Sequence, residues 1–185
     1  MRCSQRTCER RRVLQLHRTP LAPASEISGE QFQVNSDECE IIWLETMWSL
    51  QLHVGRLIEL RIWAPVKLDE LDLFGKELMA LTGQVLARGQ RAVICHDLRE
   101  LGILAPEVSD WFVRMMERDN PRIERVGILI GQGATHALQI ERMIKQAKNA
   151  TRRIFRDDLS VIAWLSEVLD SAEVAALRQF FGTGQ

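Results

Sequence analysis

The clearest pattern in this chain is a repeated alternation, between residues 91 and 169, of a short apolar run with a longer amphipathic stretch. Three runs of strand length are each followed by a stretch whose apolar residues recur at helical spacing. The predicted strands are residues 92–97, 126–130 and 153–156, and the helices predicted to follow them are residues 106–118, 134–147 and 159–169. Strands that alternate with helices of this length indicate βαβ units and a mostly parallel sheet.

Residues 48–63 precede this region and predict an antiparallel hairpin. Apolar and polar residues alternate over 48–54, Gly55 marks a tight turn, and a second strand follows over 57–63. A helix is then predicted over 68–88 from an apolar stripe at spacings of three and four, formed by Leu71, Phe74, Leu78, Leu81 and Val85.

A short closing helix over 172–181 completes the series of predicted elements. The fold class is therefore α/β, with a mixed sheet of about five strands in the order β-β-α-β-α-β-α-β-α-α and helices packed against it. Four tryptophans lie within apolar patterns and are predicted to be core residues, with partial exposure of some of them as the alternative: Trp48, Trp63, Trp111 and Trp164.

Residues 1–46 lack this periodicity. They contain six Arg and no Lys, together with scattered Pro, Ser and Glu, and their apolar residues gather only near residues 41–44. A segment with so little apolar surface to bury is typical of a flexible or disordered arm. We therefore expect a flexible N-terminal extension over residues 1–46 and one folded domain over residues 47–185.

The overall charge argues against a nucleic-acid-binding protein. The 24 Lys and Arg residues are balanced by 25 Asp and Glu residues, so the chain has no strong positive field. No apolar run approaches the roughly 18–20 residues that span a bilayer, so no membrane span is expected. The four cysteines do not require disulfides, and a cytoplasmic location is the simplest expectation.

The segment Gly131-Gln132-Gly133-Ala134-Thr135-His136 follows a predicted strand and opens a predicted helix. A glycine-rich turn lets the backbone approach an anion, and the helix N-terminus offers unpaired N–H groups. The dinucleotide-binding fingerprint is incomplete, because His136 replaces its third glycine. The alternative interpretation is a tight turn in which glycine is needed for a positive φ.

Cys95, His96 and Asp97 bring three reactive residue types together at a strand end. Neighbouring residues in a strand point to opposite faces, so Cys95 and Asp97 share one side of the sheet and His96 faces the other. A Cys–His catalytic pair is therefore geometrically poor, and Cys95 is better explained as a buried thiol. The histidines have no i+4 partner and no C-x-x-C motif accompanies them, so no metal site is predicted.

The order of elements, with residues 92–99 (AVICHDLR) and 126–147 as its most characteristic parts, resembles the STAS-like fold. This superfamily includes the bacterial anti-sigma factor antagonists and the SpoIIAA-like proteins. The resemblance covers about residues 47–169, and stand-alone bacterial proteins of this type are the most similar. In anti-sigma factor antagonists, a strand that ends in Asp-Leu is followed by a serine that a partner kinase phosphorylates. Asp97-Leu98 matches that strand end, but residues 99–107 contain no Ser or Thr, so the phosphorylation switch is not carried over.

The resemblance implies a non-enzymatic protein-interaction or regulatory module of bacterial signalling, without a cofactor. Its partner is expected to be a protein, with a homodimer as a further possibility. We expect contacts from the loops at the carboxyl ends of the strands, 101–107 and 131–136. The alternative is a domain that binds a small ligand, a lipid or a nucleotide, at the turn 131–133 and the adjacent helix N-terminus. The candidate binding residues are Asp97, Arg99, Gly131, Gly133, Thr135 and His136.

Overall fold

A computed structural model describes residues 47–148 and 150–182 of the chain. The extension predicted over residues 1–46 lies outside the described residues. The first two elements are the predicted hairpin, with strand β1 at Trp48–Val54 and strand β2 at Leu57–Ile62. These strands pair antiparallel, and Gly55 in the turn between them has a φ of 54°, a conformation that favours glycine.

Three parallel strands extend the sheet from β2: strand β3 at Ala92–Leu98, strand β4 at Ile123–Ile130 and strand β5 at Arg152–Phe155. The strand order is β1-β2-β3-β4-β5, so each strand pairs with its neighbour in sequence. The predicted mixed sheet of about five strands is thereby confirmed. The register places residues of adjacent strands opposite each other, among them Arg61 and Asp97.

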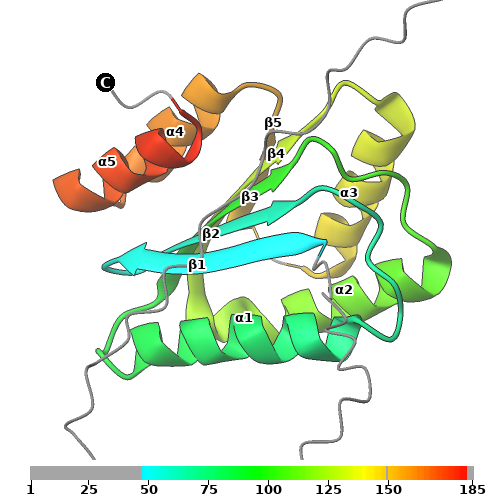
Figure 1. The fold of residues 1–185 in the computed structure, drawn as a ribbon, viewed down its shortest axis with the longest axis horizontal. Coiled ribbons are helices and arrows are strands. Elements are labelled where there is room, and N and C mark those ends of the chain that lie inside the picture. Colours follow the sequence, from blue (N-terminus) through cyan, green and yellow to red (C-terminus); the bar gives the residue numbers. More distant parts are fainter. Residues whose placement is uncertain (1–46, 149, 183–185) are drawn as a thin grey trace, which may run out of the picture. The chain divides into compact units, whose positions relative to one another are not determined.

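Helices cover both faces of this sheet (Figure 1). The three connecting helices are α1 at Leu71–Leu86, α2 at Pro106–Asp119 and α3 at Ala134–Gln146. They lie on the same face, because right-handed crossovers between strands added in one direction place every connecting helix on one side. We call this face the α1 side of the sheet.

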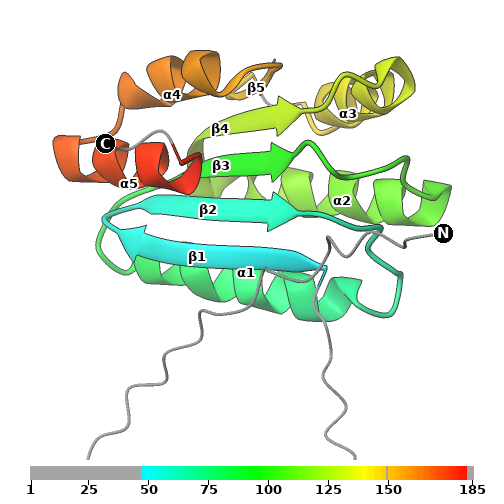
Figure 2. The same cartoon turned by 45° about the horizontal axis from the view of Figure 1, so that its top comes forward.

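The opposite face, which we call the α5 side, is covered by helix α4 at Asp158–Ser166 and helix α5 at Ser171–Phe180. Helix α4 contacts β3, β4 and β5, whereas α5 contacts β1 and β2. Figure 2 shows both helices in front of the strands, with α1 behind them. Asp157 caps α4, since its Oδ1 accepts a hydrogen bond from the N–H of Ser160 at 2.8 Å.

Each face of the sheet has its own apolar core. The larger core fills the α1 side and includes the predicted stripe of α1, with Phe74 fully buried. The smaller core lies under α4 and α5 and contains Leu57, Val93 and Cys95 from the strands. The alternation of the strands therefore sends Cys95 to the α5 side and His96 to the α1 side, as predicted.

The tryptophan prediction is correct for Trp48 and wrong for Trp63. Trp48 is buried, and its indole Nε1 donates to Glu77 Oε2 at 2.8 Å. Trp63 is 39% exposed and lies one residue beyond the end of β2. Trp111 and Trp164 are partly buried at the margins of the two cores.

The β4 residue Gly127 is required by the close packing of α4. A Cβ atom added at Gly127 would lie 2.5 Å from Val161 Cγ2 and 3.1 Å from Leu165 Cδ1. We expect Gly127→Ala to lower the free energy of unfolding by about 1–3 kcal/mol, as overpacked core substitutions do. Chemical denaturation measures this change.

Gly83 in α1 is the matched control, since a Cβ atom there has nothing within 4 Å. Gly83→Ala should leave stability unchanged or raise it by about 0.5–1 kcal/mol, because alanine is the better helix former. Equal effects of the two substitutions would contradict the close contact between β4 and α4.

Candidate functional site

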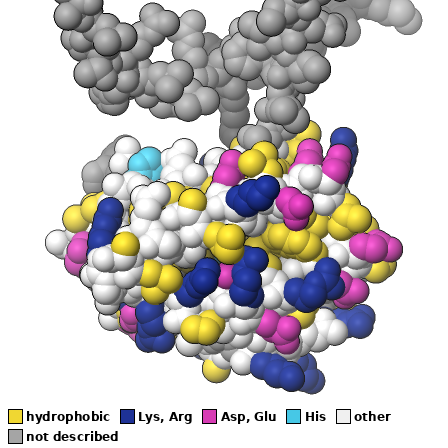
Figure 3. Space-filling view, turned by 90° about the horizontal axis from the view of Figure 1, so that it is seen from below, with side chains coloured by type: hydrophobic (Ala, Val, Ile, Leu, Met, Phe, Trp, Pro, Cys, Tyr) yellow, Lys and Arg dark blue, Asp and Glu magenta, His cyan; other side chains and the backbone are white. Residues whose placement is uncertain are grey.

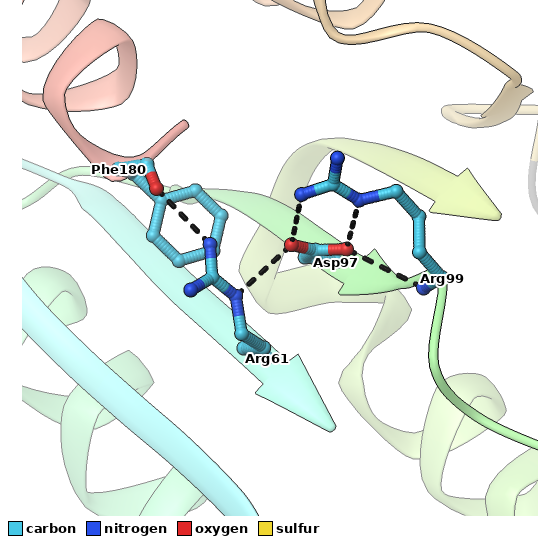
Figure 4. Close-up of polar contacts among 4 residues, drawn as sticks. All are labelled: Arg61, Asp97, Arg99 and Phe180. Atoms are coloured by element: carbon cyan, nitrogen blue, oxygen red, sulfur yellow. Dashed lines mark hydrogen bonds and ion pairs between the residues drawn. The ribbon is translucent and has the colours of Figure 1, made fainter. Parts of the chain in front are cut away.

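Asp97 and two arginines form an ion-pair cluster near the carboxyl ends of β2 and β3. The Asp97 side chain is buried on the α5 side of the sheet. Arg61 donates through Nε to Oδ2 at 2.9 Å, and Arg99 donates through Nε to Oδ1 at 2.9 Å and through Nη2 to Oδ2 at 2.8 Å. Figure 4 shows the carboxylate held between the two guanidinium groups. This arrangement satisfies the charge of Asp97 within the protein.

Two effects of opposite sign act on the pKa of Asp97. Burial raises the pKa, whereas the hydrogen bonds and positive charge of Arg99, together with the charge of Arg61, lower it. The arginines prevail, and the pKa lies below the ordinary value of 3.8. Asp97 is therefore a carboxylate at neutral pH and does not serve as a general acid.

The same arginines attach the end of α5 to the sheet. Arg61 Nη2 donates to the carbonyl oxygen of Phe180 at 3.0 Å, and the guanidinium lies 4.7 Å from the centre of the Phe180 ring (Figure 4). Arg99 lies 5.8 Å from the centre of the Phe181 ring. Asp97 and Arg99, both predicted as binding residues, thus connect β3 to α5.

The glycine-rich turn lies next to Arg99, and neither of its glycines has the predicted positive φ. Positive φ values among the described glycines occur at Gly55, Gly89 and Gly182, so neither Gly131 nor Gly133 needs the left-handed region. A Cβ atom at Gly131 would lie 2.8 Å from the carbonyl oxygen of Arg99. Gly131 is therefore required because two backbone segments approach closely, and the prediction of a positive φ is wrong.

Thr135 and His136, adjacent in sequence, are placed in different surroundings. Thr135 is exposed in the first turn of α3 and faces α2 across a groove. His136 is buried, and its Nε2 has no hydrogen-bond partner among the described residues. Burial and the positive charge of Arg156 lower its pKa. The six candidate residues thus separate into a cluster of Asp97, Arg99 and Gly131, an exposed Thr135, a buried His136, and Gly133 as the N-cap of α3.

The groove between α2 and α3 has a volume of about 470 Å³. Its lining residues come from both helices and from the loop before α2: Ile103, Pro106, Ser109, Asp110, Thr135, Leu138, Gln139, Arg142 and Gln146. The side-chain amide of Gln139 fixes this loop to α3, since it donates to the Leu104 carbonyl oxygen at 2.8 Å and accepts from the Leu104 N–H at 2.9 Å. Residues of both segments predicted to contact a partner therefore line one groove: Ile103 and Pro106 from 101–107, and Thr135 from 131–136.

Burial shifts the pKa values of two reactive side chains in β3, Cys95 and His96. Burial, with a smaller contribution from Glu59 and Asp97, raises the pKa of the Cys95 thiol well above its ordinary value. Burial and the charge of Arg152 lower the pKa of His96 to about 3, so this histidine is neutral within the α1-side core. Within residues 47–148 and 150–182, no group of three or more His, Cys, Asp or Glu side chains could hold a metal ion.

Sequence reasoning overlooked two polar residues of β2, Glu59 and Arg61. Both point to the α5 side of the sheet and line a cavity there, and Glu59 is buried. The available signal was their spacing, because two charged residues at i and i+2 of an otherwise apolar strand share one face. A charge within a strand that is covered on both faces is rare unless the charge is paired.

Comparison with known proteins bears on the fold. No protein-family model and no curated protein matches the chain. Among solved structures, the chain is similar to an uncharacterized protein of the DUF3478 family, with a SpoIIAA-like fold, from Shewanella loihica PV-4. The two structures have a TM-score of 0.50 at 15% sequence identity, and the match covers 64% of this chain and 93% of that chain. The predicted SpoIIAA-like, STAS-like fold is therefore confirmed.

Proposed function

We propose that this domain is a non-enzymatic protein-interaction module whose partner binds in the groove between α2 and α3. The observation that carries the proposal is the exposure of two large apolar side chains at that groove. Ile103 is 63% exposed and Leu138 is 65% exposed. Of the described residues, they are two of the three most exposed large hydrophobic side chains, and the third, Leu159, lies on α4. Apolar side chains that gather at a groove are typical of interaction sites.

The chemistry of the groove describes the partner that would fit. Asp110 from α2 and Arg142 from α3 line it with opposite charges beside the apolar pair. A complementary partner is a protein segment with apolar side chains along one side and charges of both signs at its margin. Figure 3, which views the molecule from below Figure 1, shows hydrophobic side chains among Lys, Arg, Asp and Glu on that face, with no field of a single sign.

The alternative function, binding of a small anionic ligand at the turn 131–133, has less support in the geometry. The carbonyl oxygen of Gly131 accepts a hydrogen bond from Arg156 at 2.7 Å, so this arginine is engaged in holding the turn. His136 is buried and does not reach the surface of the turn.

The described residues contain no helix long and apolar enough to cross a membrane.

The test compares three variants in which one exposed apolar residue is replaced by aspartate, so that all three have the same net charge. We expect Ile103→Asp and Leu138→Asp each to weaken partner binding about tenfold or more, since an interface anchor replaced by a charge loses at least 1.4 kcal/mol. Leu159→Asp is the matched control, because Leu159 is equally exposed on α4 and lies outside the groove. Capture from native lysate with each variant identifies candidates, and titration with the purified partner gives the affinities.

A partner that is retained by Leu159→Asp and lost by the two groove variants supports the proposal. Capture of no specific protein, or equal affinity for all three variants, contradicts it. Light scattering on the same proteins tests whether the partner is a second copy of this chain. In that case the mass of the wild type would be that of a dimer and the mass of Leu138→Asp that of a monomer.

A further inference from the structure

A second cavity, of about 380 Å³, lies on the α5 side of the sheet, beyond the part that α4 covers. Its walls are formed by β1, β2 and α5, and it is separate from the groove between α2 and α3. Its polar lining comes from Ser49, Gln51 and His53 on β1, Glu59 and Arg61 on β2, and Gln179 on α5. The volume is within the range of small-molecule sites, about 300–1,000 Å³.

Glu59 is the residue of this cavity whose bonding is incomplete. Its side chain is only 5% exposed, and Oε1 has no hydrogen-bond partner among the described residues. The other oxygen, Oε2, lies 3.5 Å from His53 Nε2. Burial raises the pKa of Glu59 to about 7, although the charge of Arg61 opposes this change. A buried carboxylate without a full set of partners is costly, and a ligand that supplies the missing donor stabilises it.

Arg61 does not supply that donor, even though it is two residues away on the same face. Its Nε donates to Asp97, and its Nη2 donates to the Phe180 carbonyl oxygen. Figure 4 shows this guanidinium directed toward Asp97 and α5. Asp97 thus receives hydrogen bonds from Arg61 and from Arg99, whereas Glu59 receives none from either.

The other neighbours of Glu59 provide no hydrogen-bond donor to its Oε1. Cys95 lies opposite Glu59 in the β2–β3 ladder, and its raised pKa keeps the thiol protonated and neutral. Helix α5 contributes the neutral side chain of Gln179 to the cavity. His53 is the titratable group that faces Glu59 from β1, with its Nε2 3.5 Å from Oε2. The wall of the cavity therefore contains a buried carboxylate oxygen that lacks a hydrogen-bond donor, and a donor of positive charge would suit it best.

We propose that this cavity binds a small organic cation whose ammonium or guanidinium group donates a hydrogen bond to the carboxylate of Glu59. The hydroxyl of Ser49 and the amide oxygens of Gln51 and Gln179 provide acceptors for its remaining N–H groups. This site uses none of the residues of the groove between α2 and α3, so the two proposals stand or fall separately.

Butylguanidinium is the probe, and butylurea, which has nearly the same shape without the charge, is the control ligand. Each is titrated into the ¹⁵N-labelled full chain, and amide shifts are followed. We expect saturable changes in the amide chemical shifts of β1, β2 and α5 with butylguanidinium. Butylurea should bind at least about tenfold more weakly, because a charge-assisted hydrogen bond is stronger than a neutral one.

Glu59→Gln should weaken butylguanidinium binding about tenfold or more, since the amide keeps the shape of the side chain but removes its charge. Glu141→Gln is the matched variant, because it removes the same charge from an exposed position on α3 and should leave binding unchanged. Gln51→Trp fills the cavity from the exposed edge strand and should abolish binding without altering a buried residue. This variant keeps the test valid if Glu59→Gln does not fold.

The pH dependence gives a second readout. The cation prefers ionised Glu59, so with the pKa near 7 the wild type should bind butylguanidinium about tenfold more tightly at pH 8 than at pH 6. The dependence should be absent in Glu59→Gln.

The proposal would be overturned by the absence of saturable chemical-shift changes, by equal affinity for butylurea, or by unchanged butylguanidinium binding in both Glu59→Gln and Gln51→Trp. Shifts located away from β1, β2 and α5 would do the same, since they would place the cation elsewhere.

Discussion

Asp97→Ala is expected to lower the free energy of unfolding by about 3 kcal/mol at neutral pH. The substitution leaves Arg61 and Arg99 without the carboxylate that both contact, and it removes the link from β3 to α5. Breaking a buried ion pair costs about 3–5 kcal/mol, and the lower end applies here because both arginine side chains keep part of their hydration. Denaturation in urea measures the change.

The pH dependence of this effect follows from the lowered pKa of Asp97. A carboxyl group whose pKa is lower in the folded state stabilises the protein fully above its unfolded pKa, which is 3.8. That contribution is lost as the pH falls through the folded pKa. The difference in stability between wild type and Asp97→Ala should therefore be constant at pH 5–8 and shrink below about pH 4.

Asp110→Ala is the control for this prediction, since Asp110 is exposed on α2. It should change stability by no more than about 0.5 kcal/mol. Hydrogen exchange adds a local readout, because the amides at the end of α5 should exchange faster in Asp97→Ala than in wild type. If α5 kept its full protection, Asp97 would not hold the helix in place.

The sequence predicted the fold well because its signals are local. The stripe on α1, the alternation in β1 and the apolar runs of β3 and β4 each follow from burial at a fixed period. Element ends were less accurate: the helix predicted over 68–88 spans Leu71–Leu86, and the one predicted over 159–169 spans Asp158–Ser166. End positions depend on caps and neighbouring elements, which periodicity does not encode.

The candidate site was harder to predict because its contacts join residues far apart in sequence. Gly131 is needed where the Arg99 backbone passes, and Gln139 meets the loop of Leu104 only when α2 and α3 pack. Glu59 could be recognised as a charge in an apolar strand, but its missing partner becomes visible only once Arg61 is seen to turn toward Asp97. Propensity and period contain no information about such pairings.

Phe74→Ala is expected to be among the most destabilising single substitutions in the domain, lowering the free energy of unfolding by about 3–5 kcal/mol. Phe74 is fully buried in α1 and joins three elements through edge-on ring contacts. Its ring centre lies 5.5 Å from that of Trp48 on β1, and 5.6 Å and 6.3 Å from those of Phe112 and Trp111 on α2. Removal of the ring leaves a cavity and forfeits three aromatic contacts, each worth about 0.5–1.5 kcal/mol.

Leu73→Ala provides the matched control, because Leu73 is the neighbouring residue on the same helix and is 48% exposed. It should change stability by about 0.5 kcal/mol or less. Urea denaturation followed by far-UV circular dichroism measures both variants without relying on Trp48 and Trp111, whose fluorescence the substitution itself perturbs. Because Phe74 contacts the helix that forms one wall of the partner groove, Phe74→Ala should also weaken partner binding where the variant remains folded. A loss of stability no larger than that of Leu73→Ala would mean that the ring cluster does not hold α2 in place.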